Sequence, residues 1–481
     1  MKKLEFTFLL TIAVTASVIG HRVEAQAVWP SFLGQGRTEA LDVSSLPLTW
    51  GPDDGRRWKA KITGKGQSSP IVWGDTIYVT SIDGDMKETC IVTALDLKTG
   101  DEKWRKTFDS AMPLRANYFQ SRSAPTPLAD GQHLVAFFET GTLVGLDSTT
   151  GEVQWQRSLV KDYGPFESTI GLATSPVGLG EHAFLMIDHE GESYLLAIDK
   201  ASGETVWRTP RFSRRSYASP AIIRIGDCDQ IVCSSDGSVD GYDPETGEQL
   251  WTFEDIGANS SNTPLQAGEN TVLIGASAGM QGANLRDAVE SNLCLRIDPA
   301  GDGFEPHVCW KTQKATTTFA SPMAHEGYAY WLTNVGVLYC YELETGTRVY
   351  RKRAGEQCWV TPVAVDDRVY LFGKGGTTTV IASGPEFKVL AENELWDLDS
   401  IPSTDPGAFS SQAQSRGRPG GSDIVSGGGR PPMSAEDLES ARAGGENQFA
   451  DPVQYGVAFT KDAILVRTGS EIHCLASGES P

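Results

Sequence analysis

The sequence has few of the residues that mark metal-dependent or hydrolytic active sites. Its 7 histidines form no close pair, so a histidine-based metal site is not indicated. It contains no Gly-x-Ser-x-Gly segment and no glycine loop of the kind that cradles phosphate. No two of its cysteines are adjacent. We therefore predict no catalytic residue and no metal site.

Positive charge is also scarce. The 41 Lys and Arg residues stand against 62 Asp and Glu residues, which gives a formal net charge of −21. Such an acidic surface repels phosphate backbones and anionic lipid head groups, which argues against a nucleic-acid partner. Long charged helical stretches are missing, whereas glycine (51) and proline (25) are slightly above average. This composition predicts an all-β chain of many short strands joined by tight turns.

Long apolar runs are absent except near the N-terminus. Lys2 and Lys3 precede an apolar stretch at residues 6–20, and small residues follow at 23–27. This order predicts a signal peptide at residues 1–25, so the mature chain would be periplasmic or secreted. A membrane anchor is the weaker alternative, because the run of about 15 residues is shorter than the roughly 20 needed to span a bilayer. No transmembrane segment is expected in the mature chain.

The cysteines leave their redox state open. An even number in an exported chain allows disulfides, but a chain of this length can bury a large core without them, so buried thiols and one or two bridges both remain possible. Because none precedes position 90, a lipid anchor at the cleavage site is not expected, and the protein is predicted not to be a lipoprotein. The eight cysteines are Cys90, Cys228, Cys233, Cys294, Cys309, Cys340, Cys358 and Cys474.

One phrase recurs along the chain: Ala or Gly, any residue, Asp, two variable residues, Thr or Ser, Gly, three variable residues, Trp. A drifted copy runs from Glu342 to Tyr350, and a stretched one from Asp298 to Trp310. A second phrase, Ser-Pro or Thr-Pro before an apolar run, precedes each copy. The four full copies of the first phrase occupy residues 94–104, 145–155, 197–207 and 241–251. The prolines of the second phrase are Pro70, Pro127, Pro176, Pro220, Pro264, Pro322 and Pro362.

Each unit holds four short β-favouring runs with compact links, which predicts an antiparallel meander. Asp-x-x-Thr-Gly is a turn sequence, in which Asp accepts from backbone N–H groups and Gly takes positive φ. One four-stranded sheet cannot bury both faces, so the units must stack, and a large aromatic in each would fill the space between neighbours. Stacked sheets around an axis form a β-propeller. The predicted docking aromatics are Trp58, Trp104, Trp155, Trp207, Trp251, Trp310 and Tyr350.

We predict an eight-bladed propeller of four-stranded antiparallel blades, closed by an N-terminal strand at residues 56–62 that completes the last blade. Residues 26–55 form a lead-in, and residues 56–399 form the closing strand and blades one to seven. The last blade occupies residues 453–481. Residues 400–452 are rich in Ser, Gly and Pro and are predicted to be a disordered insertion, either a solvated loop or a partner-binding arm, with a short helix considered at 434–442.

The two phrases resemble the repeats of pyrroloquinoline-quinone-like (PQQ-like) propellers, over about residues 56–400 and 453–478. This superfamily includes quinoprotein alcohol dehydrogenases and BamB-like outer-membrane assembly scaffolds, and the first phrase is similar to its tryptophan-docking motif. The resemblance implies the fold but not the activity, because the motif residues hold blades together. A quinoprotein would also be expected to have adjacent cysteines and carboxylates that bind calcium. Here the candidate carboxylates belong to turns: Asp96, Asp147, Asp199, Asp243 and Asp298.

In a meander of this kind, the links between blades share one face of the ring with the loops that join second to third strands. Arginines and aromatics gather in these links on an otherwise acidic chain, which suggests a site for an acidic ligand, a carbohydrate or an extended peptide. The alternative is that these loops are simply polar and the aromatics plug the channel. The predicted ligand-binding residues are Lys65, Arg115, Tyr118, Arg122, Tyr163, Arg214, Arg215, Tyr217 and Trp359.

Two functions are compatible with these patterns. The first is an exported, non-catalytic binding or assembly scaffold of the periplasm or cell envelope, a monomer that binds an envelope protein, a peptide or a carbohydrate and needs no cofactor. The second is an atypical quinoprotein alcohol dehydrogenase that uses PQQ with calcium. We favour the scaffold, because the sequence lacks the adjacent cysteines of the enzymes.

Overall fold

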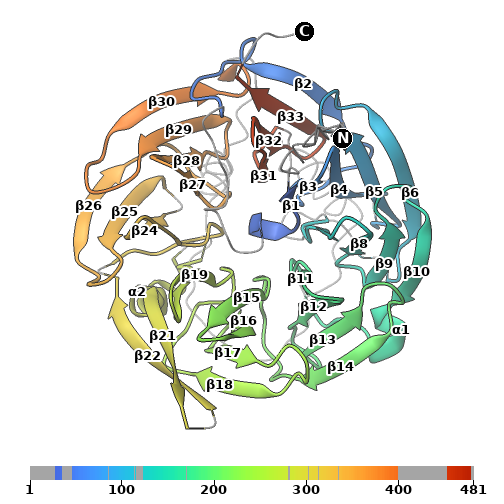
Figure 1. Ribbon diagram of the computed structural model, residues 1–481, viewed down its shortest axis with the longest axis horizontal. Helices are drawn as coiled ribbons and strands as arrows, with labels where there is room; N and C mark the ends of the chain where they lie inside the picture. The colour runs from blue at the N-terminus through green and yellow to red at the C-terminus, as the bar shows by residue number, and fades with distance from the viewer. Residues whose placement is uncertain are drawn as a thin grey trace, which may run out of the picture.

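A computed structural model of the chain describes residues 28–34, 46–84, 86–112, 114, 123–168, 171–279, 282–301, 303–312, 314–333, 335–398 and 452–477. Eight antiparallel sheets surround a central axis, which Figure 1 shows end-on. The predicted all-β, eight-bladed propeller is therefore confirmed. The expected signal peptide, the helix considered at 434–442 and nearly all of the insertion lie outside the described residues.

Blades one to seven each contain four consecutive strands, ordered from the axis outward. Blades one to four comprise β3 (Ile71–Trp73), β4 (Thr76–Asp83), β5 (Thr89–Asp96), β6 (Glu102–Asp109); β7 (Leu128–Ala129), β8 (His133–Phe137), β9 (Thr142–Asp147), β10 (Val153–Ser158); β11 (Val177–Leu179), β12 (His182–Ile187), β13 (Tyr194–Asp199), β14 (Thr205–Pro210); β15 (Ala221–Ile225), β16 (Cys228–Ser235), β17 (Ser238–Tyr242), β18 (Gln249–Phe253). Blades five to seven comprise β19 (Leu265–Gly268), β20 (Thr271–Ile274), β21 (Leu293–Ala300), β22 (Gly303–Lys311); β23 (Met323–His325), β24 (Tyr328–Leu332), β25 (Val337–Glu342), β26 (Arg348–Arg353); β27 (Val363–Val365), β28 (Arg368–Phe372), β29 (Thr377–Ala382), β30 (Val389–Glu394).

The last blade closes the ring. Its inner strands are β31 (Gly456–Phe459), β32 (Ala463–Arg467) and β33 (Glu471–Ala476). Its outer strand is β2 (Arg56–Lys61), which pairs with β33 and brings Trp58 opposite Cys474. The predicted closure by an N-terminal strand is therefore confirmed.

The first blade has one strand more than the repeat pattern predicts. β1 (Val28–Trp29) pairs with β3 on the axis side of the sheet. The chain then forms the 3-10 turn η1 (Phe32–Gly34), which lies at the centre of the ring in Figure 1. Pro30, between them, accepts a 2.8 Å hydrogen bond from the backbone N–H of Ala129 in the second blade. Part of the expected lead-in is thus built into the propeller.

A β-bulge in the outer strand of every blade explains the small residue that begins the first phrase. The bulge brings the docking position directly opposite a small residue in the third strand. A Cβ on Gly145 would lie 2.1 Å from the Trp155 ring, and one on Gly241 would lie 2.1 Å from Trp251. The residues opposite the seven predicted aromatics are Cys474, Ala94, Gly145, Ala197, Gly241, Cys294 and Cys340.

Most of the predicted docking aromatics reach the Asp-x-x-Thr-Gly turn of the next blade. Trp251 differs, since it donates to Gln230 Oε1 in its own blade, and among the described residues the buried Tyr350 hydroxyl has no such bond to the next blade. Whether the seven aromatics hold the blades together stays a prediction, tested below. Hydrogen bonds of 2.8–3.1 Å run from Nε1 of Trp58, Trp104, Trp155, Trp207 and Trp310 to the carbonyls of Leu97, Thr149, Lys200, Pro244 and Leu343, respectively.

The Ser-Pro and Thr-Pro phrase forms a buried belt around the axis. In blades two to seven, each hydroxyl accepts a hydrogen bond from the backbone N–H of the matching Ser or Thr in the preceding blade. The following proline opens the innermost strand, where its missing N–H removes no ladder bond. The belt runs from Ser69 through Thr126, Ser175, Ser219, Thr263 and Ser321 to Thr361, with N···O distances of 2.9–3.0 Å.

Helices contribute little to the fold. α1 (Leu159–Tyr163) follows β10, and α2 (Leu285–Ser291) lies between the second and third strands of the fifth blade. Within the described part of the chain, neither is long and apolar enough to cross a membrane. All eight cysteines are unbridged thiols, of which only Cys228 and Cys309 are exposed.

Candidate functional site

The predicted binding surface is one end of the ring, which we call the link face. It consists of the links between blades, such as residues 211–220 and 354–362, and the loops from second to third strands, such as residues 188–193 and 373–376. The Asp-x-x-Thr-Gly turns and the first hairpins lie at the opposite end, because connections alternate in a meander.

The structure brings only some of the predicted binding residues together. Arg115, Tyr118 and Arg122 lie outside the described residues. Lys65 is exposed and forms a backbone bridge with Ile82. The remaining residues fall into three places: Arg214, Arg215 and Tyr217 between blades three and four, Trp359 between blades six and seven, and Tyr163 in α1.

Tyr163 belongs to a structural contact at the outer rim, where Figure 1 shows α1. Its hydroxyl accepts from Arg157 Nη2 at 3.0 Å and lies 2.7 Å from Thr205 Oγ1 in the outer strand of the third blade. Arg208 stacks over the same ring at 5.0 Å. Tyr163 therefore joins the second and third blades and lies apart from the Arg214 group.

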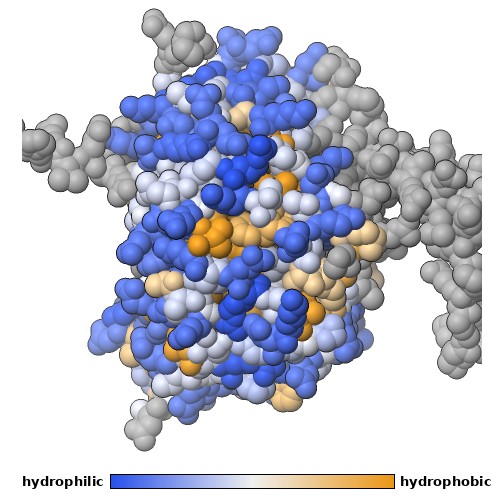
Figure 2. Space-filling view, turned by 90° about the vertical axis from the view of Figure 1, so that its right-hand side faces the viewer, coloured by the Kyte–Doolittle hydropathy of each residue, from blue (hydrophilic) through white to orange (hydrophobic). Residues whose placement is uncertain are grey.

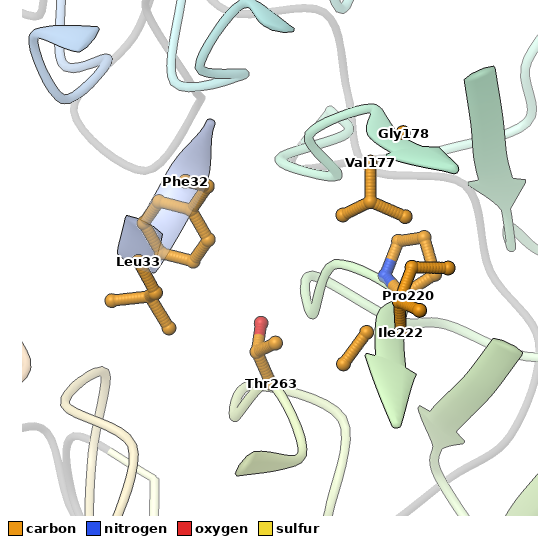
Figure 3. Close-up of a pocket in the computed structure, with 8 residues that line it drawn as sticks. Phe32, Leu33, Val177, Gly178, Pro220, Ile222 and Thr263 are labelled. Atoms are coloured by element: carbon orange, nitrogen blue, oxygen red, sulfur yellow. The ribbon is translucent and has the colours of Figure 1, made fainter. Parts of the chain in front are cut away.

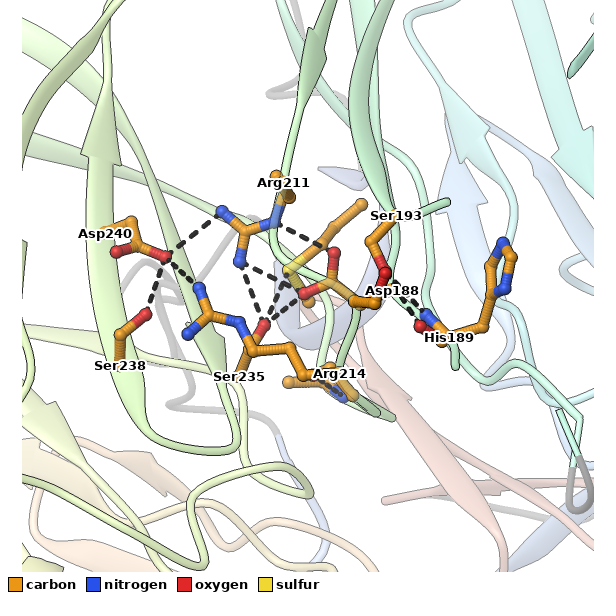
Figure 4. Close-up of polar contacts among 12 residues, drawn as sticks. Asp188, His189, Ser193, Arg211, Arg214, Ser235, Ser238 and Asp240 are labelled. Atoms are coloured by element: carbon orange, nitrogen blue, oxygen red, sulfur yellow. Dashed lines mark hydrogen bonds and ion pairs between the residues drawn. The ribbon is translucent and has the colours of Figure 1, made fainter. Parts of the chain in front are cut away.

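Beneath the link between blades three and four lies a buried ion-pair network that the sequence pattern did not predict (Figure 4). Arg211 follows β14 and is fully buried. Its Nε and Nη2 donate to the two carboxylate oxygens of Asp188 at 2.9 and 3.1 Å. Its Nη1 lies 3.2 Å from Oδ2 of Asp240 in β17. Burial opposes the charged form of Arg211, but the charge of Asp188 and the hydrogen bond to it, together with Tyr242, raise the pKa of Arg211 well above its usual value.

Arg214 joins the same network from above. Its Nη2 donates to Asp240 Oδ2 at 2.8 Å, and its side chain is only 17% exposed. Ser238 and Thr252 also donate to the Asp240 carboxylate, at 2.8 and 2.7 Å. Two arginines thus neutralise two aspartates, and the guanidinium of Arg214 is held in place by Asp240. The Arg214 side chain therefore lies beneath the surface of the link, where it holds the Asp240 carboxylate.

The accessible charge of this region is Arg215. Its side chain is 52% exposed, and its Nε lies 3.5 Å from Glu190. Phe212 is 78% exposed, and the Arg214 guanidinium packs 6.0 Å from the centre of its ring. The Tyr217 hydroxyl is buried, and burial raises the pKa of this phenol. The region therefore presents an exposed cation and an exposed aromatic ring above a buried network whose charges balance.

A second aromatic group surrounds Trp359. Phe319 meets its ring edge-to-face at 5.4 Å, and Tyr455 lies at 5.8 Å. The Lys374 ammonium lies 4.4 Å above the same ring, which is cation–π geometry. Phe319 is partly exposed, whereas the Trp359 Nε1 is buried without a partner among the described residues. These side chains come from three consecutive links between blades and from a loop of the seventh blade, so their proximity depends on the packing of successive blades.

The channel along the axis is blocked by residues from the N-terminal segment. Phe32 and Leu33 of η1 face the inner strands across a small pocket, as Figure 3 shows. Apart from the Thr263 hydroxyl, its walls are apolar, including Val177 and Ile222. Phe32 and Leu33 come from the N-terminal segment, and not from the links whose aromatics the sequence offered as an alternative plug.

Calcium takes six to eight oxygen ligands, often from carboxylates, so a calcium–quinone site would need a cluster of them. The Asp147 and Asp199 carboxylates instead accept from backbone N–H groups of their own turns, and these hydrogen bonds lower the pKa of both. Among the described residues, no three His, Cys, Asp or Glu side chains gather where they could hold a metal ion. The residues in this part of the chain do not fit a calcium–quinone group.

Comparison with known proteins places these features among PQQ-like propellers. The family described as "Outer membrane protein assembly factor BamB" matches residues 48–221 and 173–290. The chain is 29% identical over 225 residues to outer membrane protein assembly factor BamB of Burkholderia pseudomallei (strain K96243), covering 46% of this chain and 54% of that protein. It is 28% identical over 187 residues to a polyvinylalcohol dehydrogenase of Sphingopyxis sp. (strain 113P3), covering 36% and 26%.

These curated relatives are thus matched over about half and about a quarter of their own lengths. Among solved structures, BamB from Moraxella catarrhalis superimposes with a TM-score of 0.55 at 11% identity. The match covers 87% of this chain and 99% of that one. At this identity the likeness concerns the fold.

Proposed function

Because the chain belongs to the family of outer membrane protein assembly factor BamB, we propose that it is an exported, non-catalytic scaffold of the periplasm or cell envelope. In this proposal a protein partner binds to the link face. The family resemblance supports an assembly role, and the distribution of exposed side chains supports the choice of surface.

The observation that carries the proposal is that most of the exposed large apolar side chains lie on the link face. Among the described residues, ten large apolar side chains are exposed, and six of them lie in its links and loops. Aromatic residues, Met and Arg are enriched at protein interfaces, and the link face presents Phe212, against the Arg214 guanidinium, and Phe319, against Trp359. The six residues are Met86, Phe212, Leu285, Phe319, Val335 and Leu398.

The outer rim has a different character. Figure 2 views the side of the ring that carries β6 and β10, and this side is mostly hydrophilic with separate hydrophobic residues. Only three of the ten exposed apolar residues lie in outer strands, namely Val153, Val206 and Val389. Scattered single residues of this kind are normal on a soluble surface. The contrast favours the link face as the partner surface.

Photo-crosslinking in the native host would test the proposal. A photoreactive amino acid is placed at Phe212 or Phe319 on the link face, and at the exposed Lys98 or Glu245 on the opposite face as a control. We expect the same envelope protein to be captured from both link-face positions and from neither control position. Equal capture from both faces, or recovery of the protein in the cytoplasm, would contradict the proposal.

The similarity to a polyvinylalcohol dehydrogenase supports the quinoprotein alternative. Purified protein is mixed with PQQ and calcium, and quinone absorbance and alcohol-dependent dye reduction are measured. We expect neither tight quinone binding nor dye reduction. Both signals together would favour the dehydrogenase over the scaffold.

A further inference from the structure

Two cysteines oppose each other across β21 and β22 in the fifth blade. Cys294 pairs with Trp310, and the next pair is Leu295 with Val308, so Cys309 is the extra residue of the bulge. In a bulge, two residues of one strand oppose a single residue of the other. Cys309 and Cys294 are therefore about one strand spacing apart, roughly 5 Å, which lies within the Cα separation of disulfide-linked cysteines.

This pairing occurs in one blade only. The same bulge recurs in all eight blades, and its extra residue is a cysteine opposite another cysteine only in the fifth. In the other seven blades, the extra residue and the one it opposes are Arg57 and Cys474, Lys103 and Ala94, Gln154 and Gly145, Val206 and Ala197, Leu250 and Gly241, Val349 and Cys340, Leu390 and Val380.

The two thiols differ in accessibility. Cys309 is exposed on the outer strand, whereas Cys294 is 2% exposed. Burial, together with the neighbouring Cys309 thiol, raises the pKa of Cys294. A reagent from solution therefore reacts with Cys309 first. Cys294 is the thiol that the modified Cys309 can then reach.

We propose that Cys294 and Cys309 are a thiol pair that forms a cross-strand disulfide by exchange with a small disulfide such as oxidised glutathione. The Cys309 thiolate attacks one sulfur of that disulfide, which breaks its S–S bond and releases one thiolate. The Cys294 thiolate then attacks the Cys309 sulfur and releases the second. The two protein thiols are oxidised by two electrons, one small disulfide is reduced to two thiols, and their protons come from the protein thiols.

Such a bridge closes the hairpin between β21 and β22, a loop that holds residues 294–309. Cross-linking removes conformational freedom mainly from the unfolded chain, so the oxidised protein should unfold at a higher temperature than the reduced protein. Because Cys294 must lose its proton for the second step, bridge formation should accelerate as the pH rises.

The test is to incubate the whole protein with oxidised glutathione, quench with an alkylating agent under denaturing conditions, and map the peptides by mass spectrometry. We expect six of the eight cysteines to be alkylated and one linked peptide pair containing Cys294 and Cys309. The exposed Cys228 serves as the reference, since Cys228→Ser should leave the bridge intact. Cys294→Ala should leave glutathione attached to Cys309 and remove the rise in unfolding temperature.

Cys294→Ala recreates the side chain found at Ala94 and Ala197, so this variant is expected to fold. Cys309→Ser changes only an exposed side chain and should abolish the bridge independently. Eight alkylated cysteines after oxidation would overturn the proposal. So would a bridge between other cysteines, or glutathione on wild-type Cys309 beside an unreacted Cys294.

Discussion

At the residue scale, the Arg211 network is a strong determinant of stability. Asp188→Ala would leave the guanidinium buried with one carboxylate lost, which typically costs about 3–5 kcal/mol. The surface pair of Arg57 and Asp462 offers a matched control, because Asp462→Ala removes an exposed partner and should cost about 1 kcal/mol or less. Urea unfolding followed by tryptophan fluorescence would measure both. Equal effects would show that the buried pair contributes no more than the exposed one.

A second residue-scale prediction concerns acid stability. Burial, with the positive charges of Arg56 and Lys59, lowers the pKa of His473 to about 3. The unfolded chain titrates near 6.5, so between these values it binds more protons than the folded protein. The contribution of His473 to the free energy of unfolding is therefore fully present above about pH 6.5. It falls as the pH drops toward 3, by at most about 1.4 kcal/mol per pH unit.

His473→Gln should flatten this part of the stability curve, measured by urea unfolding between about pH 4 and 7. The exposed His307 on β22 provides the control, and His307→Gln should leave the slope unchanged. A slope that survives His473→Gln would assign the acid sensitivity to other groups.

At the scale of the element, the docking prediction can be tested in β10. Trp155 packs against Gly203 of the next blade, donates to Lys200 O at 2.9 Å and is half-buried. Trp155→Ala should destabilise the protein by about 3–5 kcal/mol, because it leaves a cavity between two blades. Val153→Ala, an exposed change in the same strand, should cost far less. Thermal unfolding of the two variants compares them, and similar midpoints would refute the docking role.

The sequence predicted those turns and strands whose residue pattern lies within a short stretch of the chain. The Asp-x-x-Thr-Gly turn and the spacing from Asp to Trp carry enough information to give strand order and blade number. The Gly145 position shows why the phrase also begins with a small residue, since the opposite indole leaves no room for a Cβ. A two-residue strand such as β1 has no periodicity to detect, so its place in the first blade was not predicted.

The candidate site was predicted less well, because it depends on contacts between distant residues. The topology placed Arg215 and Trp359 on one face. The pairing of Arg214 with Asp240 joins residues 26 positions apart, and no local pattern marks it. Tyr163 also lies in a link, but its contacts with the outer strand of the third blade take it to the rim. Side-chain contacts of this kind, between residues far apart in the sequence, can be identified only from the packed structure.

At the scale of the whole molecule, two N-terminal segments have different structural roles. Residues 28–34 fill the channel, and β2 supplies the strand that joins the last blade to the first. Two truncations separate these roles. A chain starting at residue 46 lacks residues 28–34 and keeps β2, whereas one starting at residue 62 lacks both, together with the buried Leu46 and Trp50.

The chain that starts at residue 46 should remain a monomer and unfold cooperatively at a lower temperature, because it loses the buried Trp29 and Leu33 side chains. The chain that starts at residue 62 should aggregate, because β33 becomes an unpaired edge in an open ring. Size-exclusion chromatography and thermal unfolding monitored by circular dichroism distinguish these outcomes. A monomeric second truncation with the same unfolding midpoint as the first would show that β2 does not hold the ring closed.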